Sequence, residues 1–415
     1  MTSVAHPPAV EQLDAEAVVA ALFSNPQPDD PYPLYDRLRA LSPVFPSATG
    51  LTFLTDYVDC QEAIRTPGLL MAGPAIARRD PRFDASEYLR TMAGMLIFTD
   101  PPDHTRLRRL VSKAFTPRMI ARVRPAVERL VDGYLDKLAD LGQFDLVAEM
   151  TDSLPAQTIC ELVGVPVDDH HLVVGWADDI STAASTPALP DDLLHIADTA
   201  VTDFHAYLDT LIAARRRDPR EDLVSRLIEA EEEGGHLDTA EMKSFMVNIL
   251  AAGTETTTHL ISVGLHTLLR HPEQLVRLRA DPGLLGGAIE EILRFESPVQ
   301  MAFVRLAPAE LRIRETTIGP GQIVAALVGA ANHDPAAYPD PHRFDITRSP
   351  GRIPLTFGAG AHFCIGAALA RLQGEVALTR ILERFPHLEP AGDPTWRNSI
   401  VLRGVRSLPL AVSPS

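Results

Sequence analysis

The chain has 415 residues, 46% of them hydrophobic, and a formal net charge of −17. This acidic balance argues against general binding to nucleic acid or to a membrane surface, and no apolar run approaches the roughly 20 residues of a membrane span. Cys60, Cys160 and Cys364 are odd in number and far apart, and no signal peptide is visible, so we expect a cytoplasmic protein without a disulfide framework.

The beginning of the chain mixes several short elements. Residues 1–30 are rich in proline and alanine, and we expect them to be a loosely ordered segment. No Gly/Ser linker divides the rest, which favours a single domain over 31–415. The patterns predict a strand at 52–54, a helix at 56–65 and an irregular stretch at 66–98.

The middle of the chain is predicted to be nearly continuous helix, from about residue 101 to 281. Its longest helix covers 239–270 and measures roughly 48 Å at 1.5 Å per residue. Asp238 and Glu241 are placed to form a capping box at its start. Few charges interrupt the centre of this helix, which is typical of a helix buried on all sides.

Short strands are expected after Pro298. The sequence predicts them at 311–313, 322–328, 400–402 and 408–412. The fold class is therefore predicted to be mainly α, with a smaller β-rich part formed from both ends of the chain.

The centre of the long helix contains residues that a buried helix usually avoids. The segment runs Ala251-Ala252-Gly253-Thr254-Glu255-Thr256-Thr257-Thr258. Glycine costs about 1 kcal/mol relative to alanine there, threonine hydroxyls can bend a helix, and a buried carboxylate is costly unless it is paired. A packing kink with a surface-facing Glu255 is the alternative. Because several such residues coincide, the segment favours a functional groove.

Cys364 lies in the segment Phe357-Gly358-Ala359-Gly360-Ala361-His362-Phe363-Cys364-Ile365-Gly366. Glycines permit turns that point backbone amides at one atom, and the predicted helix that follows adds partial positive charge. Both features lower a thiol pKa, so the loop is expected to present an anionic sulfur to a metal. An inert buried thiol and a disulfide role are the alternatives.

Two further patterns carry charge. Glu291 and Arg294 form an E-x-x-R, a spacing that also occurs by chance as a solvated ion pair. Residues 104–124 contain seven basic side chains and no acidic one, on an otherwise acidic chain. Such a basic island suggests an anionic ligand or an acidic partner.

Together these segments resemble the cytochrome P-450 superfamily of haem-thiolate monooxygenases, in its soluble bacterial form. The resemblance extends over essentially the whole chain, from about Pro31 to Val412. The cysteine segment fits the family pattern F-G-x-G-x-H-x-C-x-G at every fixed position, and the helix segment fits (A/G)-G-x-(D/E)-T. The E-x-x-R is followed, as in the family, by a P-x-R-F segment, here Pro341-His342-Arg343-Phe344.

The resemblance implies haem b as cofactor, held between the long distal helix and the proximal cysteine loop with its helix. Cys364 would be the axial thiolate of the iron, which favours O–O cleavage. Glu255 and Thr256 would be catalytic and pass protons to oxygen. Gly253 would open the distal helix so that dioxygen fits. The other implied cofactor-binding residues are His104, Arg108, Arg305 and His362 at the haem propionates, with Phe357, Gly358 and Ala252.

The remaining implied residues concern the scaffold and the substrate. Glu291, Arg294 and Arg343 would form a buried structural network behind the haem. The substrate pocket would be lined mostly by apolar side chains, which implies a medium-to-large hydrophobic substrate. Its expected members are Leu96, Ile97, Asn248, Ala251, Ala252, Val299, Met301, Ala302, Val401 and Leu402.

The implied activity inserts one oxygen atom from O2 into such a substrate, by hydroxylation or epoxidation, in secondary-metabolite tailoring. The implied electron donors are a ferredoxin and a ferredoxin reductase, docked near Arg109, Lys113 and Arg371. A peroxide-driven enzyme of the same fold is one alternative, although such enzymes generally lack the acid–threonine pair. A non-catalytic haem-binding helper protein is the other.

Overall fold

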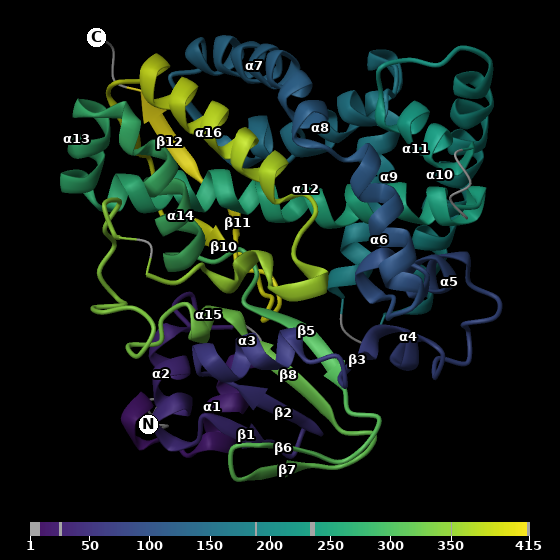
Figure 1. Ribbon diagram of the computed structural model, residues 1–415. Coiled ribbons are helices and arrows are strands. Elements are labelled where there is room, and N and C mark those ends of the chain that lie inside the picture. Colours follow the sequence, from purple (N-terminus) through teal and green to yellow (C-terminus); the bar gives the residue numbers. More distant parts are fainter. Residues whose placement is uncertain (1–8, 25–26, 187–188, 233–236, 350, 413–415) are drawn as a thin grey trace, which may run out of the picture.

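The computed structural model describes residues 9–24, 27–186, 189–232, 237–349 and 351–412. Helices form the larger, upper part of the molecule in Figure 1, and a five-stranded sheet with its covering helices forms the lower part. The predicted fold class, mainly α with a smaller β-rich part, is confirmed.

The helices differ widely in length, and the longest belong to the upper part. They are α1 Ala15–Leu22, α2 Tyr32–Leu41, α3 Tyr57–Arg65, α4 Ala72–Ala77, α5 Glu87–Ala93, α6 Asp103–Ala114, α7 Pro117–Ala139, α8 Leu154–Val163, α9 His170–Ser185, α10 Asp191–Arg217, α11 Leu223–Glu232, α12 Thr239–Arg270, α13 Pro272–Ala280, α14 Leu285–Phe295, α15 Val328–Ala331 and α16 Ala367–Arg384.

The strands form one sheet of five strands and several smaller pairings. They are β1 Val44–Pro46, β2 Leu51–Leu54, β3 Leu70–Met71, β4 Gln143–Asp145, β5 Met301–Leu306, β6 Leu311–Ile313, β7 Thr316–Ile318, β8 Ile323–Leu327, β9 Leu388–Pro390, β10 Thr395–Trp396, β11 Val405–Ser407 and β12 Pro409–Val412. The large sheet has the order β1-β2-β8-β5-β3, so two strands from the second half of the chain lie between β2 and β3 from the first half.

The large sheet is covered on both faces by hydrophobic clusters. Side chains of neighbouring strand residues point to opposite faces. Phe53 belongs to a hydrophobic cluster with α1 and α2, whereas Leu54 belongs to a cluster with α3. A third and larger cluster fills the helical part. The sheet therefore attaches the N-terminal helices to the rest of the fold.

Helix α12 is the long helix that the sequence predicts, and it crosses the molecule from side to side (Figure 1). Its capping box is present: the Glu241 amide donates to the Asp238 side chain at 2.8 Å, and the Asp238 amide donates to Glu241 Oε2 at 3.1 Å. It packs against α8, α9, α14 and α16. Helix α16, which follows the Cys364 loop, therefore packs directly against α12.

Three expectations for local structure are wrong. Part of segment 1–30 is ordered, since α1 is capped by Asp14 and buries Val18 and Val19 against the sheet. Part of 66–98 forms α4 and α5, because tertiary contacts support helices too short to show a clear period. Residues 400–402 form no strand and contribute only an isolated bridge to Val299.

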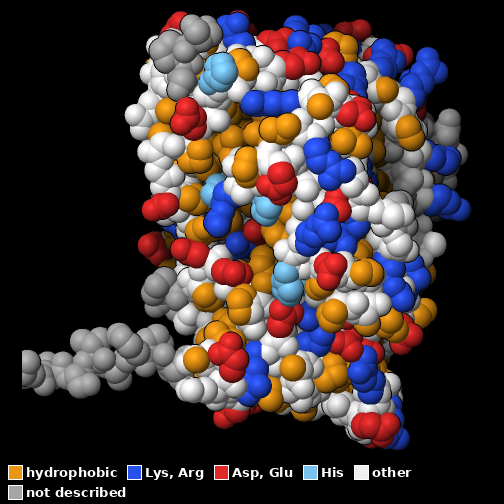
Figure 2. All heavy atoms as spheres, turned by 90° about the vertical axis from the view of Figure 1, so that its left-hand side faces the viewer, with side chains coloured by type: hydrophobic (Ala, Val, Ile, Leu, Met, Phe, Trp, Pro, Cys, Tyr) orange, Lys and Arg blue, Asp and Glu red, His pale blue; other side chains and the backbone are white. Residues whose placement is uncertain are grey.

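The helices and the surface were also compared with what a membrane span and a single acidic patch would require. No helix among the described residues is both long enough and apolar enough to cross a bilayer. On the face shown in Figure 2, acidic and basic side chains are interspersed with apolar ones, so the net charge of −17 is not gathered there in one acidic area.

Candidate active site

The loop before Cys364 has the backbone conformation that its glycines suggest. Gly358 and Gly360 have φ angles of 71° and 66°, a region that other residues enter only at a cost. The Cys364 amide donates to the Phe357 carbonyl at 2.9 Å, which closes the loop. Helix α16 starts three residues after the cysteine. The loop and the helix together fix the position of the sulfur.

Two opposing influences act on the pKa of the Cys364 thiol. The amides of Gly366 and Ala367 and the charges of Arg108 and Arg371 do lower the pKa, as the sequence suggests. Burial of the thiol is the largest effect and raises the pKa above its ordinary value. A coordinated metal cation would reverse this balance, because coordination deprotonates a thiol.

Four basic side chains from distant segments lie together beside the cysteine loop. His104 of α6 stacks on His362, with ring centroids 4.0 Å apart. Arg108 Nη2 donates to the Phe363 carbonyl at 2.7 Å, and Arg305 Nη2 donates to the Ile64 carbonyl at 3.2 Å. The structure therefore brings together the residues expected to bind the propionates.

The electrostatics of this cluster fit an anionic ligand. Burial and the neighbouring arginines lower the pKa of both histidines, to about 3 for His362. Burial also lowers the pKa of Arg108 and of Arg305. Both ring nitrogens of buried His104 lack a hydrogen-bond partner among the described residues. Two carboxylates, such as those of a haem, would accept from these donors and offset their charge.

The middle of α12 differs from the rest of the helix. Ala252 is exposed although the helix is mostly buried around it. The Thr256 hydroxyl donates to the Ala252 carbonyl at 2.9 Å, and the Thr254 hydroxyl donates to the Leu250 carbonyl at 2.7 Å. Such bonds to the carbonyl four residues earlier bend helices. The segment thus presents an open, hydroxyl-bearing turn, as a groove for a ligand requires.

Gly253 faces a side chain of α8, whereas the sequence led us to expect space for dioxygen at this residue. A Cβ atom at this position would lie 2.9 Å from Ile159 Cδ1 of α8. Gly253 therefore permits the close approach of α8 and α12, which is a packing role. Its expected role in admitting dioxygen stays a prediction.

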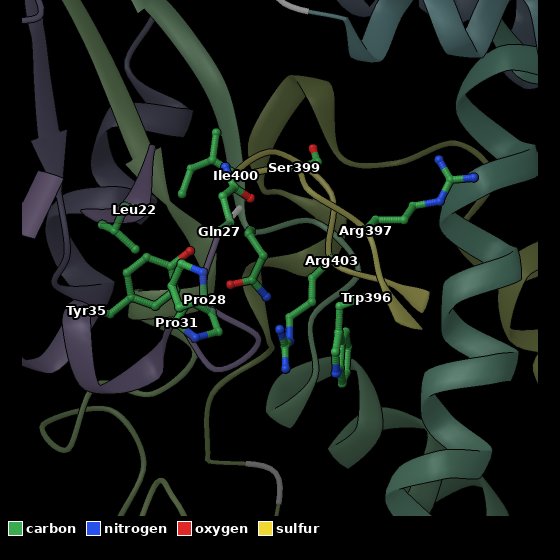
Figure 3. Close-up of a pocket in the computed structure, with 11 residues that line it drawn as sticks. Leu22, Gln27, Pro28, Pro31, Tyr35, Trp396, Arg397, Ser399, Ile400 and Arg403 are labelled. Carbon is green, nitrogen blue, oxygen red and sulfur yellow. The ribbon is translucent and has the colours of Figure 1, made fainter. Parts of the chain in front are cut away.

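Glu255 is buried and paired, so the alternative of a surface-facing carboxylate is wrong. Its Oε1 lies 2.5 Å from Arg397 Nη1 and 3.6 Å from His259 Nε2. Arg397 also lines a small pocket, and Figure 3 shows its side chain extending away from that pocket toward a helix. Sequence reasoning missed both partners. The i,i+4 spacing of His259 was a usable signal, whereas nothing local pointed to Arg397.

The structural network contains a different arginine side chain from the one expected. Glu291 and Arg294 form a bidentate pair, with both N–O distances 2.8 Å. Arg348 Nε lies 3.1 Å from both oxygens of Glu291. The Arg343 side chain is 65% exposed, and only its carbonyl accepts from Arg294. The assignment of the Arg343 side chain is therefore corrected to Arg348.

The basic island on α6 and α7 is partly neutralised by acids from other segments. The ion pairs are Arg106–Glu241, Arg122–Glu221 and Arg124–Glu375. Arg108 points inward to the cysteine loop. Arg109 and Lys113 are exposed. The exposed part of the island is therefore smaller than the sequence suggested.

Comparison with known proteins decides the family. The family model "Cytochrome P450" matches residues 68–282 and 283–404. The chain belongs to the cytochrome P450 family. Cytochromes P450 hold haem through a cysteine thiolate. This protein is accordingly a haem-thiolate monooxygenase.

Several characterised relatives cover almost the whole chain. A vitamin D(3) 25-hydroxylase of Pseudonocardia autotrophica is 37% identical over 95% of this chain and 96% of its own. The polyketide biosynthesis cytochrome P450 PksS of Bacillus subtilis is 32% identical over 92% of this chain and 96% of its own. The crystal structure of myxobacterial CYP267B1 in complex with myristic acid superimposes with a TM-score of 0.85, at 36% identity, and covers 95% of this chain and 100% of that one.

The expected substrate residues of this P450 form two groups. In the first, the Ile97 amide donates to the Asn248 side chain at 3.2 Å, one helical turn from exposed Ala252. Leu96 and Ala251 adjoin these residues in the chain. The segment around Ile97 is therefore tied directly to the open turn of α12.

The second group surrounds the start of β5. Leu402 forms a bridge with Val299, and the Val401 carbonyl accepts from the Met301 amide at 3.4 Å. Met301 is buried in the cluster of α1 and α2, and Ala302 packs against the cluster of α3. These two side chains take part in core packing, and contact of this group with a substrate stays a prediction.

Proposed function

We propose that this P450 hydroxylates or epoxidises a medium-to-large hydrophobic secondary metabolite, of which a polyketide is the leading class. The open turn at Ala252, bordered by Ile97 and Asn248, is the observation that carries the proposal. Two relatives are named for vitamin D(3) hydroxylation and for polyketide biosynthesis, and a third was solved with myristic acid. These ligands share an extended apolar surface, which suits a pocket with few polar groups.

The proposed residue roles are supported by the geometry. Cys364 Sγ would ligate the iron, while His104, Arg108, Arg305 and His362 would hold the propionates, and Phe357 and Gly358 would shape the proximal wall. When bound, the haem supplies the activation of dioxygen. Glu255 Oε and Thr256 Oγ1 would hold and move the protons that this reaction consumes.

The substrate class can be tested by titrating the purified holoenzyme with a library of polyketides, fatty acids and sterols. Binding near the iron is expected to shift the Soret absorbance, and turnover is expected to give a product heavier by one oxygen atom. A spin-state shift confined to small polar compounds would contradict the proposed substrate class.

The ligand and proton roles need separate variants. Cys364→Ser is expected to abolish the absorbance of the ferrous carbon monoxide complex that is characteristic of a thiolate ligand. Glu255→Gln is expected to keep that absorbance and to lower the product formed per NADPH by about 10-fold or more. High turnover with peroxide alone that Glu255→Gln leaves unchanged would favour the peroxide-driven alternative.

The electron donors we propose are a cytoplasmic ferredoxin and its reductase. Helix α6 directs His104 and Arg108 inward, and it exposes Arg109 and Lys113 on its outer side. An acidic ferredoxin would meet this basic surface, and the attraction would raise the rate of encounter.

The docking surface can be tested by charge reversal. Combined Arg109→Glu and Lys113→Glu substitutions are expected to slow ferredoxin-dependent reduction and to weaken its dependence on salt. Arg279→Glu is the matched control, because Arg279 is exposed on α13, which lies on the opposite side of the molecule (Figure 1). Equal slowing by both variants would contradict a docking site at α6.

A further inference from the structure

His259 of α12 is buried in a way that ordinary packing does not favour. The side chain is fully buried, and both ring nitrogens lack a hydrogen-bond partner among the described residues. Burying a polar group without a hydrogen-bond partner destabilises the folded protein. A leucine of similar size would avoid that cost. A buried polar group of this kind therefore calls for an explanation beyond core packing.

The imidazole of His259 contacts the carboxylate of Glu255. The His259 Nε2 atom lies 3.6 Å from Glu255 Oε1, one helical turn away. Arg397 Nη1 contacts the same oxygen at 2.5 Å. Both of these contacts fall on Oε1, one from the same helix and one from the segment after β10. One anchor is charged, and the other is a neutral imidazole at neutral pH, because burial lowers the pKa of His259.

The segment between β10 and β11 is shaped around this pair of α12 residues. A Cβ atom at Gly404 would lie 1.9 Å from His259 Nδ1, so the backbone at this position rests directly on the imidazole. The Gly404 carbonyl accepts from the Arg397 amide at 2.9 Å. Arg397, which pairs with Glu255, and Gly404, which leaves room for the His259 ring, are thus joined by a backbone hydrogen bond.

We propose that His259 is a positioning residue for Glu255, seated by Gly404 and acting with Arg397 to set the orientation of the carboxylate. This inference rests on the proposed proton role of Glu255. His259 would touch neither substrate nor haem, and it would act only through the Glu255 carboxylate. Arg397 holds Glu255 from the β10–β11 segment, and the imidazole of His259 contacts the same carboxylate oxygen from its own helix.

The decisive experiment compares His259→Leu with His259→Gln in the holoenzyme. Leucine removes the polar contact and glutamine keeps an N–H donor of similar reach. His259→Leu is expected to unfold at the same temperature as the wild type or higher, yet to form about 10-fold less product per NADPH. His259→Gln is expected to recover most of that loss. Gly404→Ala is expected to act like His259→Leu, since its methyl group would displace the ring.

The outcomes separate this inference from the proposed function. Unchanged product per NADPH in His259→Leu, or equal loss in the leucine and glutamine variants, would overturn the role of His259. Glu255→Gln, measured alongside, tests the proton role itself, and a fully coupled Glu255→Gln enzyme would overturn both. Arg406→Gln, exposed on β11, is the matched control and is expected to behave like the wild type.

Discussion

Two clusters of polar side chains in this protein differ in how their charges are compensated. Around Glu291, the carboxylate binds Arg294 and Arg348, and Arg294 also donates to the carbonyls of Asn332 and Pro341 at 2.9 and 2.8 Å. Beside Cys364, two histidines and two arginines meet, and His104 has no hydrogen-bond partner among the described residues.

The contrast separates a structural role from a ligand-binding role. A buried ion pair whose remaining donors and acceptors are satisfied is costly to break, because either partner alone would be an uncompensated charge. Arg108 and Arg305 carry charges of the same sign beside two neutral imidazoles, and an anion would offset those charges. The first cluster should therefore matter for folding, and the second for holding the haem.

The largest effect is expected in the Glu291 cluster. Arg294→Met leaves Glu291 buried with one arginine fewer, and it should lower the free energy of unfolding by about 3–5 kcal/mol. Urea denaturation measures this loss. Arg384→Gln serves as control, because Arg384 and its partner Asp136 are at least half exposed. A loss below about 1 kcal/mol in Arg294→Met would remove the contrast between the clusters.

A smaller effect should identify the second arginine of the network. Arg348→Gln removes two charged contacts to Glu291, and the expected loss is about 1.5–3 kcal/mol. Arg343→Gln should cost less than about 0.5 kcal/mol, because that side chain is 65% exposed. The reverse order in thermal or urea unfolding would restore the assignment made from the P-x-R-F pattern.

The second cluster should respond in the opposite sense. His104→Leu removes an unsatisfied buried imidazole, and the haem-free protein should be as stable as the wild type or about 1 kcal/mol more stable. The same change should speed the loss of haem to an acceptor protein, since one propionate partner is gone. Slower folding of His104→Leu with an unchanged rate of haem release would show that His104 has a structural role instead.

The smallest effect concerns pH. His333 lies next to the Glu291 cluster, and burial together with Arg294 holds its pKa well below the ordinary value of 6.5. The unfolded chain therefore binds a proton that the folded chain does not, and stability contributed by neutral His333 is lost as pH falls below about 6.5. His333→Gln should reduce the slope of unfolding free energy between pH 6.5 and 5. An unchanged slope would show that other histidines dominate.

Features set by neighbouring residues were predictable from the sequence. The bounds of α12 and its Asp238–Glu241 capping box follow from hydrogen bonds between residues a few positions apart. The left-handed backbone at Gly358 and Gly360 follows from the lack of a side chain. The contiguous pattern around Cys364 likewise pointed to a metal ligand without any knowledge of the fold.

Features set by partners far along the chain were not predictable. Nothing near Glu255 announces Arg397, and nothing near Glu291 announces Arg348 rather than Arg343. Helix α1 is too short to show its order by itself, and the sheet against which it packs comes largely from later segments. Whether the pKa of the Cys364 thiol is raised or lowered also depends on burial, which only the complete structure reveals.

The family, the axial cysteine expected for it and the course of the distal helix can therefore be read from the order of the residues. These rest on short-range hydrogen bonds, backbone sterics and contiguous motifs. Only the tertiary structure decided which charges meet, which polar groups stay unsatisfied and which way Glu255 is held. The physical reason is that Coulomb energies and desolvation depend on the distance between side chains in space and not on their separation along the chain.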